Sequence, residues 1–222
     1  MYFIKLILIS LLLALSYSYA NGNDLSELTP VDDPFEFQNE YYPITVGNYW
    51  KMAYYTIDSD YKSKFKVYFN QTIVDYTFHE IYFGDSLYYL PVFRQKVESR
   101  PLSKTMDKQI SYNYLIKTKQ GILISTEEPK FKKFKTRIFI PQDSSYDSLS
   151  EIIAQMKIVR DVNVNTGTWE LNCLKIEWIG EGDLGNYFYS KGLGHVLTQH
   201  FRIIGNKARP STQFILEEYL IH

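Results

Sequence analysis

The sequence has one cysteine in 222 residues, which excludes an intramolecular disulfide and a zinc site built from several thiolates. It also has almost no net charge, because 24 lysines and arginines stand against 25 acidic residues. A chain without excess positive charge has no general electrostatic attraction for nucleic acid. Hydrophobic residues make up 45% of the chain, too many for a disordered protein, so a folded domain is expected.

Aromatic residues are plentiful instead. The chain has 20 tyrosines and 14 phenylalanines, and 17% of its residues are aromatic. Both residue types favour strands and half-buried surfaces, so the composition indicates β-structure. Every tyrosine beyond the first 20 residues lies from Tyr41 onward, which places the aromatic excess in the predicted folded domain.

The first 20 residues have the three parts of a secretory signal. Lys5 supplies the positive charge, residues 6–15 form an apolar run broken only by Ser10, and Ser18 and Ala20 are small residues before the expected cleavage site. The run is too short for an ordinary transmembrane helix, which needs about 20 apolar residues. We therefore expect an exported protein, periplasmic or extracellular, with no transmembrane segment after cleavage. An uncleaved membrane anchor is the alternative.

The rest of the chain divides into two parts. Residues 21–40 are polar, acidic and without periodicity, and are predicted to form a flexible leader. Residues 41–222 contain short segments in which apolar and polar residues alternate between turn residues, which predicts a single mainly β domain of about ten antiparallel strands. One or two helical turns are predicted at residues 148–153, where Ser148 and Glu151 have capping-box spacing, and a strand there is the alternative.

Two short motifs resemble a known group of sequences. Residues 42–50 read Tyr-Pro-Ile-Thr-Val-Gly-Asn-Tyr-Trp, and a late turn reads Tyr-Ser-Lys-Gly-Leu-Gly over residues 189–194. Together they resemble uncharacterised secreted bacterial β-proteins. The resemblance implies a single curved antiparallel sheet, a half-barrel or partly closed barrel like that of lipoprotein carriers or lipocalins, and it implies no activity. Between the two motifs lies a turn that reads Thr-Gly-Thr-Trp over residues 166–169, which the same group of sequences shares. The residues that carry the motifs and this turn are Gly47, Asn48, Trp50, Gly167, Lys191, Gly192 and Gly194.

The residue types in these motifs favour structural roles. Gly47 and Asn48 tolerate left-handed dihedrals before a strand, and Trp50 then becomes a core anchor. The late glycines allow a bend or a close backbone approach. A phosphate-binding loop is the functional alternative, but the late turn lacks the strand–loop–helix setting that such loops need.

Catalytic and metal-binding patterns are absent from the sequence. There is no zincin or nucleophile-elbow motif, and adjacent carboxylates on a strand point to opposite faces. We therefore predict no catalytic residue, no metal ligand and no cofactor. Glu177, Glu181 and Asp183 form the least unsuitable calcium cluster, although they lack the EF-hand pattern. Cys173 lies in an apolar alternation and is predicted to be a buried, inert thiol.

Two local features carry open alternatives. A basic run interleaved with Phe131 and Phe134 could attract an anionic partner or a membrane surface, or could be a solvated strand face that blocks edge pairing. Asn70-Gln71-Thr72 fits an N-glycosylation acceptor. The basic residues are Lys130, Lys132, Lys133, Lys135 and Arg137.

Consecutive aromatic residues at 54–55, 82–83 and 88–89 place rings on both faces of their strands. We therefore predict an exported, non-enzymatic protein whose second aromatic face binds an apolar small molecule, a lipid or another amphipathic ligand. A cell-envelope structural or protein-interaction module is the first alternative, and a hydrolase with dispersed carboxylates is the second. Tyrosines that merely occupy exposed strand positions would explain the pattern without a ligand. The predicted ligand-binding residues are Tyr54, Tyr55, Tyr82, Tyr88, Tyr112 and Tyr114.

Overall fold

The computed structural model describes residues 25–36, 39–101, 108–142, 156–179, 183–205 and 207–222, and all regular structure in these ranges is β. The predicted helical turns at 148–153 lie outside the described residues. The eleven strands are β1 (Tyr49–Ile57), β2 (Ser63–Phe83), β3 (Ser86–Pro101), β4 (Ile110–Thr118), β5 (Gly121–Ser125), β6 (Ile138–Pro141), β7 (Met156–Asn165), β8 (Glu170–Ile179), β9 (Asp183–Ser190), β10 (Gly194–Ile204) and β11 (Lys207–Leu220).

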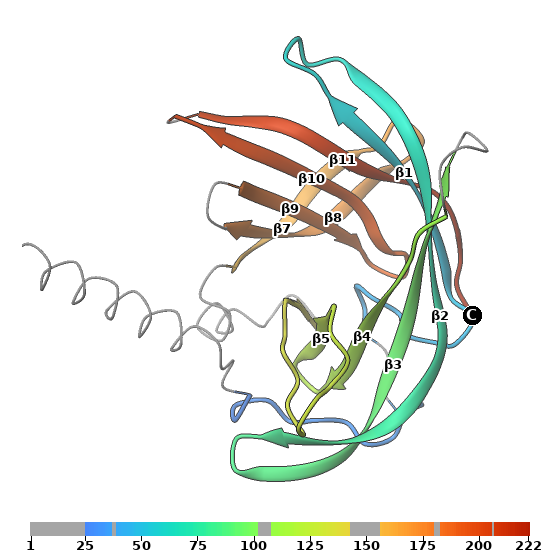
Figure 1. Ribbon diagram of the computed structural model, residues 1–222, viewed down its shortest axis with the longest axis vertical. Helices are drawn as coiled ribbons and strands as arrows, with labels where there is room; N and C mark the ends of the chain where they lie inside the picture. The colour runs from blue at the N-terminus through green and yellow to red at the C-terminus, as the bar shows by residue number, and fades with distance from the viewer. Residues whose placement is uncertain (1–24, 37–38, 102–107, 143–155, 180–182, 206) are drawn as a thin grey trace, which may run out of the picture.

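The strands form one antiparallel sheet in the order β6-β5-β4-β3-β2-β1-β11-β10-β9-β8-β7. The first strand therefore lies in the middle of the sheet, paired with β2 on one side and with β11 on the other. Figure 1 shows that the sheet curls around a central space, with β2 to β4 on one side and β7 to β10 on the other. The edge strands β6 and β7 do not pair with each other, so the fold is a half-barrel, as predicted.

Alternating apolar residues of the strands meet on the concave face and form the main core. Trp50 and Met52 of β1 are fully buried, and Lys51 between them points to the other face of the sheet. Each such buried side chain stabilises the fold by about 1.5–3 kcal/mol. Other core members on further strands are Ile73, Phe93, Leu115, Ile122, Ile140, Leu174, Ile176, Tyr189, Val196 and Leu216.

The segment before β1 enters the curl of the sheet. The Tyr42 ring stacks on Trp50 with 5.2 Å between centroids, and it meets the edge of Tyr189 at 5.8 Å. Gln95 of β3 donates a hydrogen bond from Nε2 to the Tyr42 hydroxyl, 2.5 Å away. Because these partners lie on three well-separated strands, Tyr42 fills the concave side and links the two halves of the sheet.

A second, smaller core covers the opposite face of β4 to β6. Ile116 and Leu123 point into it, and residues of the β2–β3 hairpin and of the N-terminal segment close it. Its other members are Leu25, Leu28, Ile81, Phe83, Leu90, Val92, Phe134 and Phe139.

The described part of the predicted flexible leader is packed against the sheet, which differs from the sequence expectation. Leu25 and Leu28 are each only 4% exposed. The Val31 amide donates to the Lys117 carbonyl, 3.1 Å away, and the buried Lys117 ammonium donates to the Pro34 carbonyl at 2.7 Å. Burial lowers the pKa of this amine to about 8. The average composition of this segment is polar, but Leu25, Leu28 and Val31, spaced three residues apart, pack it against the sheet.

The two sequence motifs meet in the structure. The Trp50 indole nitrogen donates to the Leu193 carbonyl at 2.5 Å, and the Gly192 amide donates to the Glu40 carbonyl at 2.8 Å. The Lys191 ammonium pairs with the Glu40 carboxylate at 2.7 Å. The late turn therefore closes directly over the indole.

The remaining motif residues hold the ends of strands. The Gly47 amide donates to the Ile73 carbonyl, and the Asn48 side chain bonds the Pro43 carbonyl and the His222 amide. The Gly167 amide donates to the Asn165 side chain in the β7–β8 turn.

Gly194→Ala should destabilise the protein more than Gly192→Ala. Both glycines have positive φ, of 88° and 73°, so each alanine costs about 1–2 kcal/mol of backbone strain. A Cβ at Gly194 would lie 3.0 Å from the Trp50 indole nitrogen, whereas a Cβ at Gly192 meets nothing within 4 Å. We expect Gly194→Ala to cost about 1–3 kcal/mol more in urea unfolding, since it overpacks the core. Equal losses in the two variants would show that Trp50 moves aside freely.

Candidate ligand-binding face

A row of rings crosses the concave face beyond the main core. The Tyr54 ring of β1 lies 5.9 Å from Phe69 of β2 and 4.8 Å from Phe214 of β11, measured between centroids. His200 of β10 lies 6.2 Å from Phe214, and Tyr187 of β9 lies 5.9 Å from His200. These five residues, here called the concave aromatic row, come from five neighbouring strands.

Strand register explains why these rings align. Tyr54 is directly opposite Phe214. On β10, His200 lies two residues beyond Thr198, the partner of Phe214, and therefore on the same face of the strand. Tyr54 also follows Trp50 and Met52 at even spacing, so it continues the concave side of β1.

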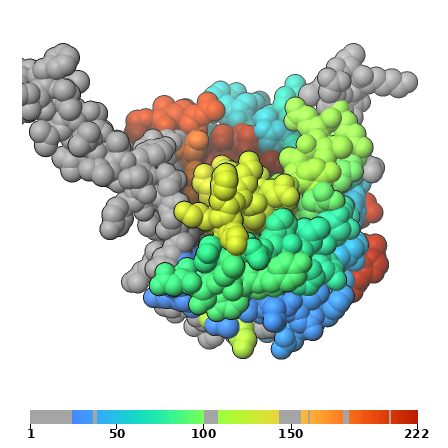
Figure 2. Space-filling model, turned by 60° about the horizontal axis from the view of Figure 1, so that its bottom comes forward, coloured from blue at the N-terminus to red at the C-terminus, as the bar shows by residue number. Residues whose placement is uncertain are grey.

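The row is accessible because all five rings are only partly buried, whereas the core residues beneath them are buried. Gly185 of β9 lies opposite His200, and a Cβ there would come within 3.2 Å of the Tyr187 ring. The missing side chain lets Tyr187 and His200 approach each other. In Figure 2 red atoms of the C-terminal strands lie in a hollow behind the yellow segment.

The two polar residues at the β9–β10 end of the row, His200 and Tyr187, are uncharged at neutral pH. Burial lowers the pKa of His200, and nearby Asp183 only partly opposes this shift. Burial also raises the pKa of Tyr187, against the charge of Arg137. The row is therefore an aromatic surface with two neutral hydrogen-bonding groups at its β9–β10 end.

A second histidine lies near this end but belongs to the packing. The His195 ring lies 5.4 Å from the Tyr189 ring, and its Nε2 is 2.5 Å from the Thr198 hydroxyl. Burial lowers the pKa of His195 to about 4.

The structure separates the six tyrosines predicted to bind a ligand. Tyr54 joins the row, while its neighbour Tyr55 lies on the convex face, 5.6 Å from Phe65. Tyr82 and Tyr88 lie at the end of the β2–β3 hairpin. Tyr112 lies under the Arg94 guanidinium at 5.1 Å, and Tyr114 packs against the second core.

Four members of the row were not among the predicted residues. Phe69 could have been grouped with Phe65 and Val67 by alternation alone, but a bulge between β1 and β2 changes the register at Tyr54 and Tyr55. Phe214, His200 and Tyr187 become neighbours of Tyr54 only through the pairing of β1 with β11. No local sequence signal specifies that pairing.

The other chemical candidates have different surroundings. Among the residues that the structure describes, no group of three or more histidines, cysteines or carboxylates could hold a metal ion. Glu177 pairs with Lys175 at 2.5 Å, and Glu181 of the weak calcium cluster lies outside the described ranges. Cys173 is 1% exposed, and burial raises its thiol pKa to about 12. No helix in the described part of the chain is long and apolar enough to cross a membrane.

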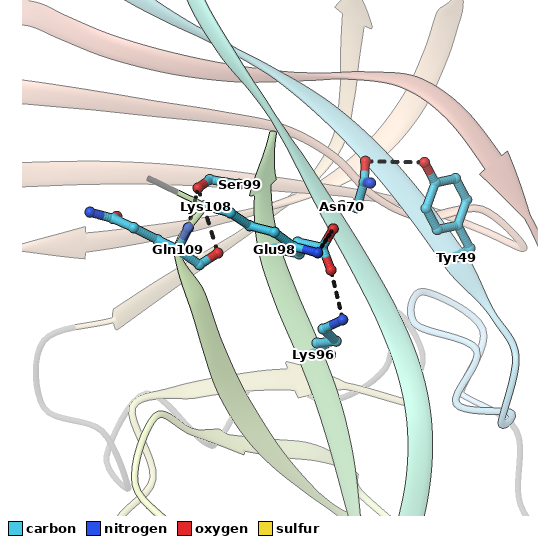
Figure 3. Close-up of polar contacts among 7 residues, drawn as sticks. All are labelled: Tyr49, Asn70, Lys96, Glu98, Ser99, Lys108 and Gln109. Atoms are coloured by element: carbon cyan, nitrogen blue, oxygen red, sulfur yellow. Dashed lines mark hydrogen bonds and ion pairs between the residues drawn. The ribbon is translucent and has the colours of Figure 1, made fainter. Parts of the chain in front are cut away.

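The convex face also carries a group of polar contacts on β1 to β4 (Figure 3). Glu98 lies between the ammonium groups of Lys96 and Lys108, at 2.6 and 2.8 Å, and its side chain is 12% exposed. The Tyr49 hydroxyl donates to the Asn70 side chain at 3.1 Å. Asn70 is 5% exposed in the interior of β2, so the folded protein does not offer this predicted acceptor to a glycosylating enzyme.

Comparison with known proteins gives only a distant likeness. No family model matches the sequence, and no curated protein matches it significantly. A proposed exported protein with a YmcC-like fold from Bacteroides fragilis has a TM-score of 0.49 at 12% identity, over 82% of this chain and 100% of its own. A proposed lipoprotein from Parabacteroides distasonis has a TM-score of 0.45 at 10% identity, over 83% of this chain and 100% of its own. Likeness at this level carries no property of either protein to this chain.

Glu98→Gln should reduce the loss of stability in acid. Lys108 and Lys96 lower the pKa of Glu98 from 4.5 to about 2. Because the folded-state pKa is below the unfolded one, the carboxylate stabilises the fold above about pH 4.5, and this contribution is lost as the pH falls toward 2. Urea unfolding of the wild type should weaken across this window more steeply than unfolding of the variant.

Glu127→Gln is the matched control, since the Glu127–Lys135 pair is more than half exposed on both sides and should contribute little. An unchanged pH dependence in Glu98→Gln would contradict the assigned role of the two lysines.

Proposed function

We propose that the protein is an exported, non-enzymatic binding protein whose concave aromatic row holds an apolar or amphipathic ligand. The observation that carries the proposal is the continuity of the row. Five partly buried rings on adjacent strands face one side of a curved sheet. The signal-like N-terminus supports export.

The geometry suits an apolar ligand for a physical reason. Partly buried aromatic rings keep apolar area in contact with water, and covering that area stabilises a complex by about 25 cal/mol per Å². A concave wall contacts a ligand on more than one side, which raises the area covered. Phe69, Tyr187 and Phe214 pack against the main core on one side and remain partly exposed on the other.

The polar end of the row favours an amphipathic ligand over a purely apolar one. Tyr187 and His200 are neutral and can donate or accept hydrogen bonds. A ligand with an apolar chain and one hydrogen-bonding group would cover the phenylalanines and place its polar end near β9 and β10.

A protein-interaction module is the second candidate. The edge strands β6 and β7 lack a strand partner on their outer sides among the described residues. An added strand from another chain could pair there and cover the concave face at the same time.

Tyr54→Ala should weaken binding of an apolar fluorescent dye, such as N-phenylnaphthylamine. Loss of one ring from a covered surface corresponds to about tenfold in affinity, at 1.4 kcal/mol per factor of ten. Tyr55→Ala is the matched control, because the adjacent ring is on the convex face and its loss should leave the affinity within about twofold. Dye titration measures both, with thermal unfolding as the check on folding.

Native mass spectrometry of protein purified from its source is the complementary experiment. A co-purified apolar molecule that is lost from the Tyr54→Ala protein would support the proposal. If the wild type arrives without a bound molecule and binds no apolar dye, the ligand proposal fails.

A further inference from the structure

We propose that the end of the β2–β3 hairpin, together with the turn at residues 130–133, docks the protein on a negatively charged lipid surface. The hairpin end and this turn are called the docking end below. The proposal does not depend on a ligand in the concave aromatic row.

The turn holds an aromatic ring in water at an energetic cost. Lys130 and Lys133 close it with backbone hydrogen bonds of 3.0 and 3.3 Å. Phe131 and Lys132 both have left-handed dihedrals, with φ of 53° and 60°, in positions that normally favour glycine or asparagine. Phe131 is nevertheless 93% exposed. Nothing within the described protein compensates for presenting this ring, which points to a partner outside it.

The turn is fixed to the hairpin. The Tyr82 amide of β2 donates to the Lys132 carbonyl at 2.8 Å, and the Lys132 ammonium pairs with Glu80 at 2.8 Å. Phe134, next after the turn, is buried in the second core. Figure 2 shows the yellow segment, to which this turn leads, beside the green β2–β3 hairpin on one face of the molecule. Phe131 therefore has a defined position relative to the hairpin end.

The hairpin end adds further exposed apolar side chains. Tyr88 and Tyr89 are adjacent and point to opposite faces, at 39% and 65% exposure. Tyr89 stacks on Phe78 at 5.1 Å, while Tyr88 lies 5.9 Å from Phe83. Tyr82 and Leu87 complete the set at 44% and 42% exposure.

This distribution favours a lipid surface over a protein partner. Rings on both faces of a hairpin, next to a protruding ring, suit a medium that surrounds the end rather than a flat surface that meets one side of it. Tyrosine also prefers the membrane interface, where its ring is in an apolar region and its hydroxyl is hydrated.

The charges nearest Phe131 in the turn are positive, which favours a negatively charged surface at this point. Three lysines share the turn with it, and Lys135 follows. Acidic neighbours limit the attraction: Glu80 pairs with Lys132, Glu127 pairs with Lys135, and Asp85 and Glu128 lie close in sequence. The attraction is therefore local to the turn, where lysines can contact anionic headgroups while Phe131 enters the acyl boundary.

Phe131→Asn tests the proposal with little risk to folding, because asparagine tolerates a left-handed dihedral and the ring is exposed. The purified mature protein should co-sediment with vesicles of phosphatidylcholine and phosphatidylglycerol, and more weakly with vesicles of phosphatidylcholine alone. Loss of the ring should lower the partition coefficient on the mixed vesicles by about tenfold.

Tyr61→Asn is the matched control. Tyr61 is 66% exposed at a φ of 61° in the β1–β2 turn, which Figure 1 shows at the opposite end of the molecule from the β2–β3 hairpin. This variant should bind vesicles as the wild type does. A Lys130→Glu/Lys133→Glu variant should lose binding to the mixed vesicles and most of its salt dependence.

Fluorescence gives a second readout that does not depend on affinity alone. Phe131→Trp should show a blue-shifted difference spectrum when mixed vesicles are added, and Tyr61→Trp should not. The proposal is overturned if the wild type ignores anionic vesicles, or if Phe131→Asn binds them as tightly as the wild type. It is also overturned if Tyr61→Asn loses as much, or if only a protein partner binds this end.

The two proposals fail separately. Tyr54→Ala should bind vesicles as the wild type does and bind the dye more weakly. Phe131→Asn should bind the dye as the wild type does and bind vesicles more weakly.

Discussion

Pairing of the first strand with the last is the constraint on which the rest of the structure depends. It places β1 in the middle of the sheet, and strands on either side then add outward to the edges β6 and β7. Trp50 lies at this central seam, where Tyr42 stacks on it and the Leu193 carbonyl accepts its indole N–H. The opening motif and the late glycine turn are thus two halves of one contact. Without the seam, neither the concave core nor the row above it would be continuous.

A single curled sheet has to bury one face with its own residues. The concave side is filled at one end by Tyr42 and its neighbours, and the second core uses Leu25 and Leu28 to cover the outside of β4 to β6. The convex face of β1 to β4 instead carries charged groups such as Glu98 with its two lysines. On the concave side, the aromatic row remains partly exposed. The row is exposed because Tyr42 and its neighbours fill only one end of the concave side and do not extend over these rings.

Alternation in the sequence predicted antiparallel strands and the opposite orientations of Tyr54 and Tyr55, because side-chain direction in a strand is a local property. The curvature of the single sheet was implied only by the resemblance to secreted β-proteins. The row itself could not be predicted, since Tyr54 meets Phe214 only through a pairing between the two ends of the chain. The packing of residues 25–36 against the sheet was not predicted, for a different reason. Composition averaged over a polar stretch hides a few apolar side chains, and burial depends on those few.

One strand connects the two proposed surfaces. β2 runs for 21 residues, with Phe69 of the concave row near its start and the exposed hairpin end at its finish. A bulge between Ile73 and Asp75 interrupts its pairing with β3 between these two regions. Bulges bend a strand and increase its twist. The same strand can therefore contribute a ring to the interior of the half-barrel and then turn away to project its last residues into solvent. A lipid-facing end on the strand that also lines the ligand face would hold that face at a fixed distance and orientation from the membrane.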